Sequence, residues 1–391
     1  MQEILPALEQ CWMSCAEKNK IEYKVVNVDE TPLRQFMSFL LQSDAIVIIA
    51  FNETIARFMV EVRTRLGLTI PFLFHVHGLA SIALWPLHHF GVLQLMTEED
   101  SFLVTCPGDL NCLKLISDNL QARMIPFPYY PMEIKPKAES SQSFAYVGRI
   151  SDQKNIDVVI KAYHLIVQEN EKAPPLLIYG KEDFLGSPNM GIKSSQCLAD
   201  LMELVSSLNL EDKVLFKDFV QREVLYGELG GNHIFVSASS HSDENFGMAL
   251  MRSLSLGATA AVSEWGGHIL FGMNMPEKVK MAPVSFAGDR PRPEVEQFKE
   301  AMKAALAIKV NPEEPMTLPA FFSPDVIADQ FRGVLKPLST HADKLQLTSL
   351  ALSLFEEKKN WNAKGDLQKV FSSYQDPKAK LFLQAYRTTS G

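Results

Sequence analysis

The sequence predicts an α/β protein of two lobes, each built on a parallel β-sheet, followed by a helical C-terminal segment. Short apolar runs alternate with helical stretches along most of the 391 residues. The runs are continuously apolar rather than alternating, which is typical of parallel strands buried on both faces of a sheet. A segment rich in proline and serine, residues 126–143, interrupts this order. We interpret it as the connection between the lobes.

The N-terminal lobe is expected to span residues 1–125 and to begin with a helix-like stretch, Gln2–Lys18. Strands and helices then alternate, which implies right-handed βαβ connections. The expected strands are Tyr23–Val28, Ala45–Phe51, Phe72–Val76 and Phe102–Cys106, and the expected helices are Pro32–Leu41, Glu53–Leu66 and Pro107–Asn119.

The second lobe is expected to span residues 144–335 and to repeat this alternation. Its expected strands are Ser143–Val147, Leu176–Tyr179, Val214–Phe216, Ile234–Ala238 and Thr259–Val262, and a helix is expected at Ile156–Glu169. Ser194 or Ser195 can cap a further helix. The apolar stripe of that helix is Leu198, Leu201, Met202, Val205 and Leu208. Residues 336–391 form the helical tail, with helices expected near Lys344–Lys359, Leu367–Tyr374 and Pro377–Arg387.

Composition excludes several classes of protein. A net charge of -8 argues against a broad nucleic-acid surface, which needs a basic face. No apolar run approaches the length of a membrane-spanning helix, and the N-terminus lacks a signal pattern, so we expect a cytoplasmic protein.

The five cysteines include no CxxC pair, so reduced thiols are expected, with Cys11 and Cys15 in the core. The acidic run Glu98–Asp100 is expected in a solvated loop.

The strongest chemical signal is the segment from Tyr146 to Asn155. A strand ends near Gly148, and Arg149 and Lys154 follow in one short loop before a helix. Glycine lets a ligand approach the backbone, and two cations beside a helix N-terminus can hold a diphosphate. Taken alone, the loop is more typical of a solvated basic turn. Gly180, just past the next strand, can line the same cleft or form a plain turn.

A second signal follows the expected strand Ile234–Ala238. Glu244, Asn245, Phe246, Gly247 and Met248 open a helix there. Gly247 lets an anion or a sugar reach the backbone N–H groups of the helix start, and the Glu244 carboxylate can accept hydrogen bonds from sugar hydroxyls. The alternative is that Glu244 is an acid placed at a helix start without a ligand.

Two glycine motifs at strand ends complete the pattern. Gly266-Gly267 follows the strand Thr259–Val262, and His77-Gly78 follows a strand of the first lobe. The carboxyl ends of parallel strands are where α/β sheets bind ligands, although each motif is also compatible with an ordinary turn. The four histidines His75, His77, His88 and His89 have no carboxylate partner in a suitable spacing, so no metal site is expected.

In this order, the motifs of residues 144–270 resemble the donor-binding lobe of the retaining GT-B glycosyltransferases of family four, the glycosyl transferases group 1. The resemblance implies that Arg149 and Lys154 bind the donor diphosphate. It also implies that Glu244 and His77 contact the sugar near its reacting centre, and that Gly247 opens the helix that holds the sugar. The further donor-binding positions that the resemblance implies are Gly148, Gly180, Asn245, Phe246 and Met248. The implied fold is GT-B-like, with two Rossmann-like lobes that face a cleft.

Two departures from the family qualify this interpretation. The family has a second glutamate eight residues after the first, which binds the ribose, and this chain has Arg252 there. Arginine presents only hydrogen-bond donors, so donor recognition is altered or weakened. The family also begins with a strand and a glycine-rich loop, whereas this chain begins with a helix-like stretch, which predicts a short, atypical N-terminal lobe.

The leading hypothesis is therefore a glycosyltransferase that moves a sugar from a nucleotide-sugar donor with retention of configuration and without a cofactor. The acceptor, a glycan, a lipid-linked sugar or a protein, is not specified by the sequence. The main alternative is a noncatalytic GT-B homologue that acts as a binding or regulatory subunit, with a protein partner or a second copy contacting the C-terminal tail. A sugar-phosphate isomerase or epimerase of similar shape is a third hypothesis.

Overall fold

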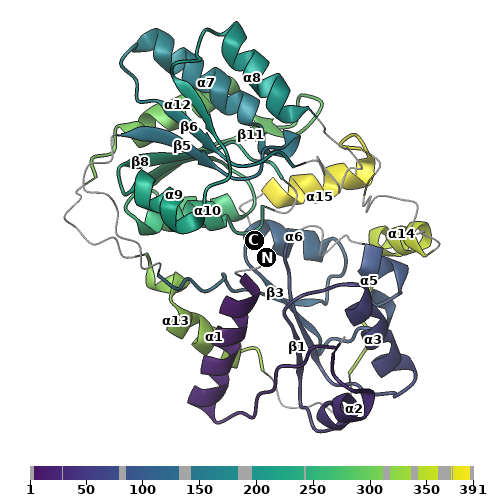
Figure 1. Ribbon diagram of the computed structural model, residues 1–391. Coiled ribbons are helices and arrows are strands. Elements are labelled where there is room, and N and C mark those ends of the chain that lie inside the picture. Colours follow the sequence, from purple (N-terminus) through teal and green to yellow (C-terminus); the bar gives the residue numbers. More distant parts are fainter. Residues whose placement is uncertain are drawn as a thin grey trace. The chain divides into compact units, whose positions relative to one another are not determined.

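The computed structural model describes residues 4–28, 30–78, 85–131, 142–183, 196–241, 244–310, 318–335, 342–359, 371 and 373–387 (Figure 1). The chain forms two compact units. Unit 1 comprises Met1–Tyr130, Pro319–Val370 and Ser390–Gly391, and unit 2 comprises Pro131–Leu318 and Phe371–Thr389. Each unit therefore combines segments that are distant in the sequence, and neither coincides with one of the predicted lobes.

Unit 1 is built on a parallel sheet whose strand order is β1-β2-β3-β4. The strands are β1 (Ile46–Ile48), β2 (Phe72–His75), β3 (Ser101–Val104) and β4 (Gln121–Met124). The helices between them are α3 (Glu53–Thr64), α5 (Trp85–His89) and α6 (Pro107–Lys114), and α2 (Leu33–Leu41) precedes β1. Every residue of β2 and β3 is buried, as the continuous apolar runs predicted.

One predicted strand of unit 1 is absent, and one strand was not predicted. The run expected as a strand at Tyr23–Val28 has no regular structure over residues 21–27. Its apolar residues alternate with charged ones, and Val25 is 55% exposed, so this run has no buried face to place in a sheet. Conversely, β4 was not predicted, because its sequence QARM is mostly polar and three of its four residues are exposed at the sheet edge.

The first helix packs on a helix from near the end of the chain. In α1 (Ile4–Asn19), Trp12 stacks on Phe331 of α13 (Pro324–Arg332), with ring centroids 4.3 Å apart. The Trp12 Nε1 donates a hydrogen bond to His75 Nε2 over 2.8 Å. Cys11 and Cys15 lie in this interface, and all five cysteines are buried free thiols, as expected. Residues 319–335, assigned in the sequence to the second lobe, thus pack in unit 1.

Asp100 corrects another expectation. It was expected in a solvated acidic loop, but its side chain is fully buried and forms an ion pair with Arg63 at 2.7 Å. Asp100 also accepts hydrogen bonds from the backbone N–H groups of Phe72 and Thr97, at 2.7 and 2.8 Å. Burial raises the pKa of Asp100, and the Arg63 guanidinium opposes that rise. The pair fixes the amino end of β2 to the loop before β3.

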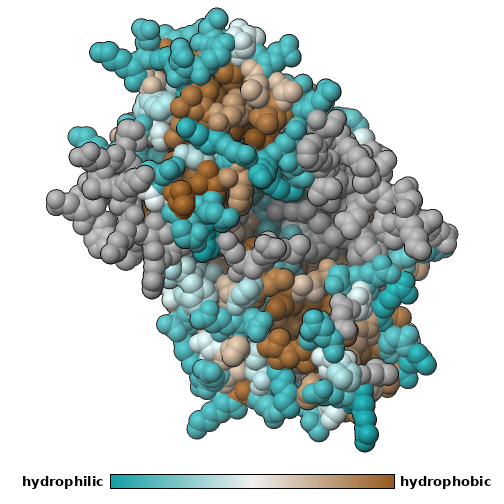
Figure 2. Space-filling view, viewed as in Figure 1, coloured by the Kyte–Doolittle hydropathy of each residue, from teal (hydrophilic) through white to brown (hydrophobic). Residues whose placement is uncertain are grey.

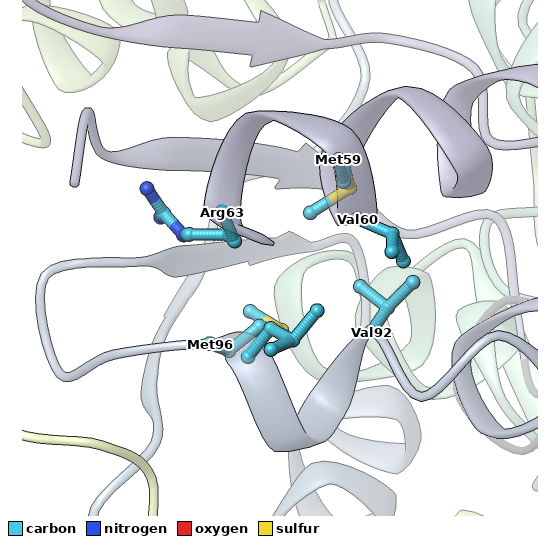
Figure 3. Close-up of a pocket in the computed structure, with 6 residues that line it drawn as sticks. Met59, Val60, Arg63, Val92 and Met96 are labelled. Carbon is cyan, nitrogen blue, oxygen red and sulfur yellow. The ribbon is translucent and has the colours of Figure 1, made fainter. Parts of the chain in front are cut away.

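Figure 3 shows the other side of Arg63. Its aliphatic stem lines a small apolar pocket between α3 and the 3-10 turn Leu93–Leu95, while its guanidinium points away from that pocket. The pocket is too small to hold a sugar, so we assign it to packing. Its lining residues are Met59, Val60, Arg63, Val92, Leu95 and Met96.

Unit 2 is built on a parallel sheet with the strand order β10-β9-β8-β5-β6-β7. The strands are β5 (Ser143–Val147), β6 (Leu176–Tyr179), β7 (Val214–Lys217), β8 (His233–Ser237), β9 (Thr259–Ser263) and β10 (Val279–Ala282). The crossover from β7 to β8 and the central position of β5 make it a doubly wound sheet. A short antiparallel pair, β11 (Val284–Ser285) and β12 (Arg292–Pro293), follows β10.

Helices pack on both faces of this sheet. The helices α7 (Ile156–Glu169), α8 (Cys197–Ser207) and α12 (Val295–Leu306) share a core with Phe144 and Tyr146, and α9 (Arg222–Leu229) packs on the side of Ala145. Unit 2 also contains the helices α10 (Met248–Ser255) and α11 (Gly267–Asn274). In α8, Met202 was expected in the apolar stripe but is 53% exposed, because the buried face is centred on Leu201 and Val205. The expected caps Ser194 and Ser195 lie outside the described residues.

The C-terminal segment is divided between the two units. The helix α14 (Ser349–Lys358) belongs to unit 1 and begins after Thr348, whose side chain accepts a hydrogen bond from Ala351 N. The helix α15 (Pro377–Arg387) belongs to unit 2. Most of the helix expected at Leu367–Tyr374 lies outside the described residues, and the described positions 371, 373 and 374 are not helical. The predicted helical C-terminal region is present, but it is not a single appendage.

On the face in Figure 2, hydrophilic residues predominate among the coloured atoms, and apolar residues gather in separate patches. Among the residues that the structure describes, no helix is both long enough and apolar enough to cross a bilayer.

The Arg63–Asp100 ion pair gives a direct test of the unit 1 core. We expect Arg63→Met to destabilise unit 1 by about 3–5 kcal/mol, because it leaves the buried Asp100 carboxylate without its cation. The matched control is Arg65→Met, which removes an exposed arginine paired with Glu61 one turn away and should cost only about 0.5 kcal/mol. Chemical denaturation followed by circular dichroism measures both. Equal losses for the two variants would contradict a structural role for the buried pair.

Candidate donor-binding site in unit 2

The candidate site lies where four neighbouring strands of unit 2 end. Since β9, β8, β5 and β6 are adjacent and parallel, their carboxyl ends meet at one edge of the sheet (Figure 1). The loops that leave these strands contain the motifs singled out in the sequence. The fold therefore brings together the Arg149–Lys154 loop, Gly180, the Glu244 segment and Gly266-Gly267.

Gly148 and Gly180 pack directly against each other at the ends of β5 and β6. Gly148 N donates a hydrogen bond to Tyr179 O over 3.0 Å. A Cβ atom on Gly180 would lie 1.8 Å from Gly148 O, and the φ of Gly180 is 153°. Only glycine fits at position 180 without moving the loop that carries Arg149. The structure thus gives Gly180 a packing role, and its predicted contact with a donor stays a prediction.

Asn155 fixes the loop that carries the two cations. The 3-10 turn η2 (Asp152–Lys154) ends at Asn155, which adopts a left-handed conformation with φ 48°. The Asn155 side-chain amide donates to Ala238 O over 3.0 Å and to Ser240 Oγ over 2.8 Å. In addition, Ser240 N donates to Gln153 O over 3.0 Å. The loop after β5 is therefore fastened to the loop after β8.

Lys154 and Glu244 form a buried ion pair across these two loops. The Lys154 Nζ contacts Glu244 Oε2, and the side chains are 13% and 15% exposed. The same Nζ lies 3.4 Å from Ser239 Oγ. Burial by itself raises the pKa of Glu244, but the adjacent Lys154 ammonium outweighs it and holds the pKa well below its usual range. The Glu244 side chain is therefore a carboxylate at neutral pH, at the start of α10.

Arg149 is held by an acid and a histidine. Its Nη1 pairs with Asp183, and its Nη2 donates to His241 Nε2 over 3.1 Å. Burial holds the pKa of His241 well below its ordinary value, and the cations Lys154 and Arg149 lower it further. His241 is consequently a neutral imidazole that accepts from Arg149. The Arg149 side chain remains 49% exposed, so the guanidinium stays accessible to a ligand.

The glycine pair after β9 allows the Glu244 segment to lie close to it. A Cβ on Gly266 would lie 2.2 Å from Glu244 O, and a Cβ on Gly267 would lie 2.3 Å from Phe246 N. Gly267 N donates to Glu244 O over 2.6 Å. Phe246 is buried and packs on Phe271 of α11. These contacts set the position from which α10 begins.

The start of α10 provides backbone donors beside this carboxylate. Gly247, with φ 91°, is the residue before the helix, and a Cβ there would lie 3.3 Å from the His268 ring. Asn245 is buried, whereas Met248 is half-buried in the first turn. The first N–H groups of such a helix are free to bind an anion or a sugar oxygen.

Arg252 lies in the last turn of α10 and is half-buried. Burial lowers the pKa of its guanidinium. The ion pair described for Glu244 is with Lys154, and Asp243 lies outside the described residues. The structure thus places Arg252 on the helix that Glu244 precedes, at the opposite end of that helix from Gly247.

His77, the predicted site residue of the first lobe, belongs to unit 1. It follows β2, its Nε2 lies 2.8 Å from Ile49 O, and its ring stacks on Phe127 with centroids 5.4 Å apart. Burial lowers the pKa of His77, so the imidazole is neutral at neutral pH. Its predicted role toward a sugar stays a prediction. Among the described residues, no group of three or more His, Cys, Asp or Glu side chains could hold a metal ion.

Sequence reasoning missed four residues that shape the site, namely Asp183, His241, His268 and Trp265. His241 lies three residues before Glu244, and Trp265 and His268 flank Gly266-Gly267, so closeness to these motifs in the sequence was the available signal. Asp183 gave no such signal, because its partner Arg149 is 34 residues away in the sequence.

The comparison with protein families supports this assignment. Residues 132–269 match the family described as Glycosyl transferases group 1, a range that contains all the site residues of unit 2 just described. This range is the part of the chain that carries the predicted resemblance. The chain is therefore similar to the group 1 glycosyltransferases over this range.

One curated protein is similar to part of this chain. The chain is 31% identical over 121 residues to mannosylfructose-phosphate synthase of Agrobacterium fabrum. That stretch is 31% of this chain and 25% of the relative, so the chain spans about a quarter of the length of the curated relative it matches.

Solved structures share the fold at low sequence identity. Sucrose-phosphate synthase from Thermosynechococcus elongatus superposes with a TM-score of 0.52 and 19% identity, over 77% of this chain and 75% of that one. HepE from Anabaena, solved with UDP and glucose, gives 0.54 and 12%, over 83% and 89%. The predicted fold class, α/β with parallel sheets and GT-B glycosyltransferases as structural neighbours, is confirmed.

The close packing at Gly267 is testable through stability. We expect Gly267→Ala to destabilise unit 2 strongly, because its methyl group would overlap the backbone of Phe246. The control is Gly227→Ala in α9, where a Cβ meets nothing within 4 Å. This substitution should be stabilising by about 0.5–1 kcal/mol, since alanine favours a helix. Thermal unfolding of both variants is the measurement, and an unchanged melting temperature for Gly267→Ala would show that the close approach is not required.

Proposed function

We propose that this protein is a glycosyltransferase that moves a sugar from a nucleotide-sugar donor to an acceptor with retention of configuration. The observation that carries the proposal is the Lys154–Glu244 ion pair, which places a cation and a carboxylate beside the start of α10. Arg149 adds a second, accessible cation from the same loop as Lys154. Such a set of charges suits a ligand that has an anionic diphosphate next to a hydroxylated sugar.

The proposed chemistry is electrostatic. As the bond between the anomeric carbon and the diphosphate breaks, negative charge develops on the leaving diphosphate. Arg149, Lys154 and the backbone N–H groups after Gly247 are fixed in position to stabilise that charge. The proposal includes no cofactor, because side-chain cations supply this stabilisation within the protein itself.

Glu244 is proposed to bind the sugar. The pKa of its carboxyl group is lowered, so the carboxylate is ionised at neutral pH and can accept hydrogen bonds from sugar hydroxyls. By family resemblance, His77 of unit 1 is the second sugar-contacting residue, and Gly148, Gly180, Asn245, Phe246 and Met248 complete the donor-binding set. HepE was solved with UDP, so UDP and its sugars are the first probes to use.

One observation favours a second candidate, a noncatalytic homologue that binds a partner. Arg252 occupies the position at which the family resemblance expects a carboxylate for the ribose, and burial lowers the pKa of its guanidinium. A cation that is half-buried at this point presents donors where the ribose hydroxyls need acceptors. This candidate retains the fold but predicts no donor binding.

The proposed contacts of Arg149 and Lys154 with the diphosphate can be tested by binding measurements alone. We expect Arg149→Ala and Lys154→Ala each to weaken nucleoside diphosphate binding by about 1.5–3 kcal/mol, since each removes a charge-assisted contact. The control is Lys303→Ala, which removes a cation from the surface of α12 and should leave affinity unchanged. Calorimetric titrations with UDP, GDP and ADP give the affinities. Parent-like affinity in both site variants would refute the assignment.

Arg252 decides between the two candidates. If the protein is a working transferase, Arg252 has acquired a role with the donor, so Arg252→Glu should weaken nucleotide-sugar binding. If it is a noncatalytic homologue, the parent should bind no nucleotide sugar, and Arg252→Glu should either restore binding or leave it undetectable. Calorimetry measures the affinity, circular dichroism checks folding, and Arg222→Glu, at the partly exposed first residue of α9, controls for reversal of charge.

A further inference from the structure

The C-terminal helix α15 is built into the core of unit 2. It buries Ala379, Phe382, Leu383 and Tyr386. The Tyr386 ring lies 5.5 Å from the Trp265 ring, centroid to centroid, and both side chains are fully buried. A Cβ on Gly266 would lie 2.7 Å from Tyr386 Cε1. Tyr386 therefore packs against the loop that joins β9 to α11.

That loop is in turn connected to the segment before α10. Trp265 Nε1 donates a hydrogen bond to His241 O over 2.8 Å. The same carbonyl accepts from Glu244 N over 3.0 Å. A short chain of contacts thus runs from the C-terminal helix through Trp265 to the backbone of His241 and Glu244.

Two contacts of the donor site depend on this segment. His241 presents its Nε2 to Arg149 Nη2, and Glu244 presents its carboxylate to Lys154. Gly267, next to the residue that Tyr386 contacts, holds Glu244 O through its N–H group. A shift of the Trp265 loop would move the histidine that holds Arg149 and the carboxylate that holds Lys154.

We propose that α15 is a structural part of the donor site, with Tyr386 and Trp265 as positioning residues for Arg149 and Glu244. The effect on donor binding rests on the proposed function, whereas the ordering of the loop does not. An arginine that is half-exposed loses conformational freedom when it binds a phosphate. Holding it in place beforehand reduces that loss, which improves affinity without a new contact.

The variant that tests this proposal is Tyr386→Ala, with Tyr386→Phe as the conservative change that keeps the ring. The matched control is Phe382→Ala, which truncates an equally buried ring of the same helix that packs on Phe371. All three are made in the full chain. Hydrogen–deuterium exchange without ligand follows the peptides that contain the Glu244 and Gly267 amides, and calorimetry with UDP, GDP and ADP follows diphosphate affinity.

We expect Tyr386→Ala to speed exchange at these amides and to weaken diphosphate binding, each by up to about tenfold, the size of effect that one aromatic pair can have. Tyr386→Phe should match the parent within about twofold. Phe382→Ala should lower the melting temperature but leave both readouts at parent values. Parent-like exchange in Tyr386→Ala, or equal changes in Tyr386→Ala and Phe382→Ala, would overturn the proposal. A parent that binds none of the diphosphates would refute the proposed function, and the exchange comparison would still decide the positioning role.

Discussion

The candidate site depends on one interaction, the ion pair between Lys154 and Glu244. It links the loop after β5 to the loop after β8, two segments that are 90 residues apart in the sequence. Removing one partner of such a pair leaves an uncompensated charge and costs about 3–5 kcal/mol in other proteins. The surrounding structure supports the pair. Asn155 ties the same two loops together, and the glycines at 266 and 267 leave room for the Glu244 segment.

This arrangement has a consequence for how a donor would bind. Lys154 is already neutralised by Glu244, and Arg149 is already paired with Asp183. A diphosphate must therefore share each cation with a resident carboxylate. The gain on binding is smaller than for a free cation, but the cations need no reorganisation, which is what electrostatic stabilisation of a leaving group requires. The C-terminal helix contributes through Tyr386 and Trp265, which order the same segment from the other side.

The sequence predicted much of this fold, because buried parallel strands are recognisable as continuous apolar runs. The strands β2, β3, β5, β6, β8 and β9 were located this way. The helix α12 was not predicted, although a helical spacing is present in its buried residues, which are Phe298, Ala301, Met302 and Ala305. The strand β4 was beyond this reasoning, because its exposed edge position removes the apolar signal. Asp100 was misjudged because its burial depends on Arg63, 37 residues away.

The residues of the candidate site, like the strands, were predictable where the signal is local in the sequence. Arg149, Lys154 and Glu244 stand in local motifs with recognisable spacing, and the structure brings them together. Their partners are set by tertiary packing, so Asp183 and Tyr386 could not be assigned from the sequence. The tail that contains Tyr386 was expected as an appendage, since its polar, amphipathic sequence does not reveal which surface its apolar face covers.

The most direct test of this account compares UDP and UDP-glucose binding to the parent and to Glu244→Gln by calorimetry, with GDP and ADP and their glucose derivatives as alternatives. Glutamine keeps the shape of the side chain but removes the charge that competes for Lys154. The account predicts that Glu244→Gln binds the diphosphate at least as tightly as the parent and loses the additional affinity that the sugar gives. A variant that loses diphosphate affinity, or that keeps the full preference for the nucleotide sugar, would contradict the account.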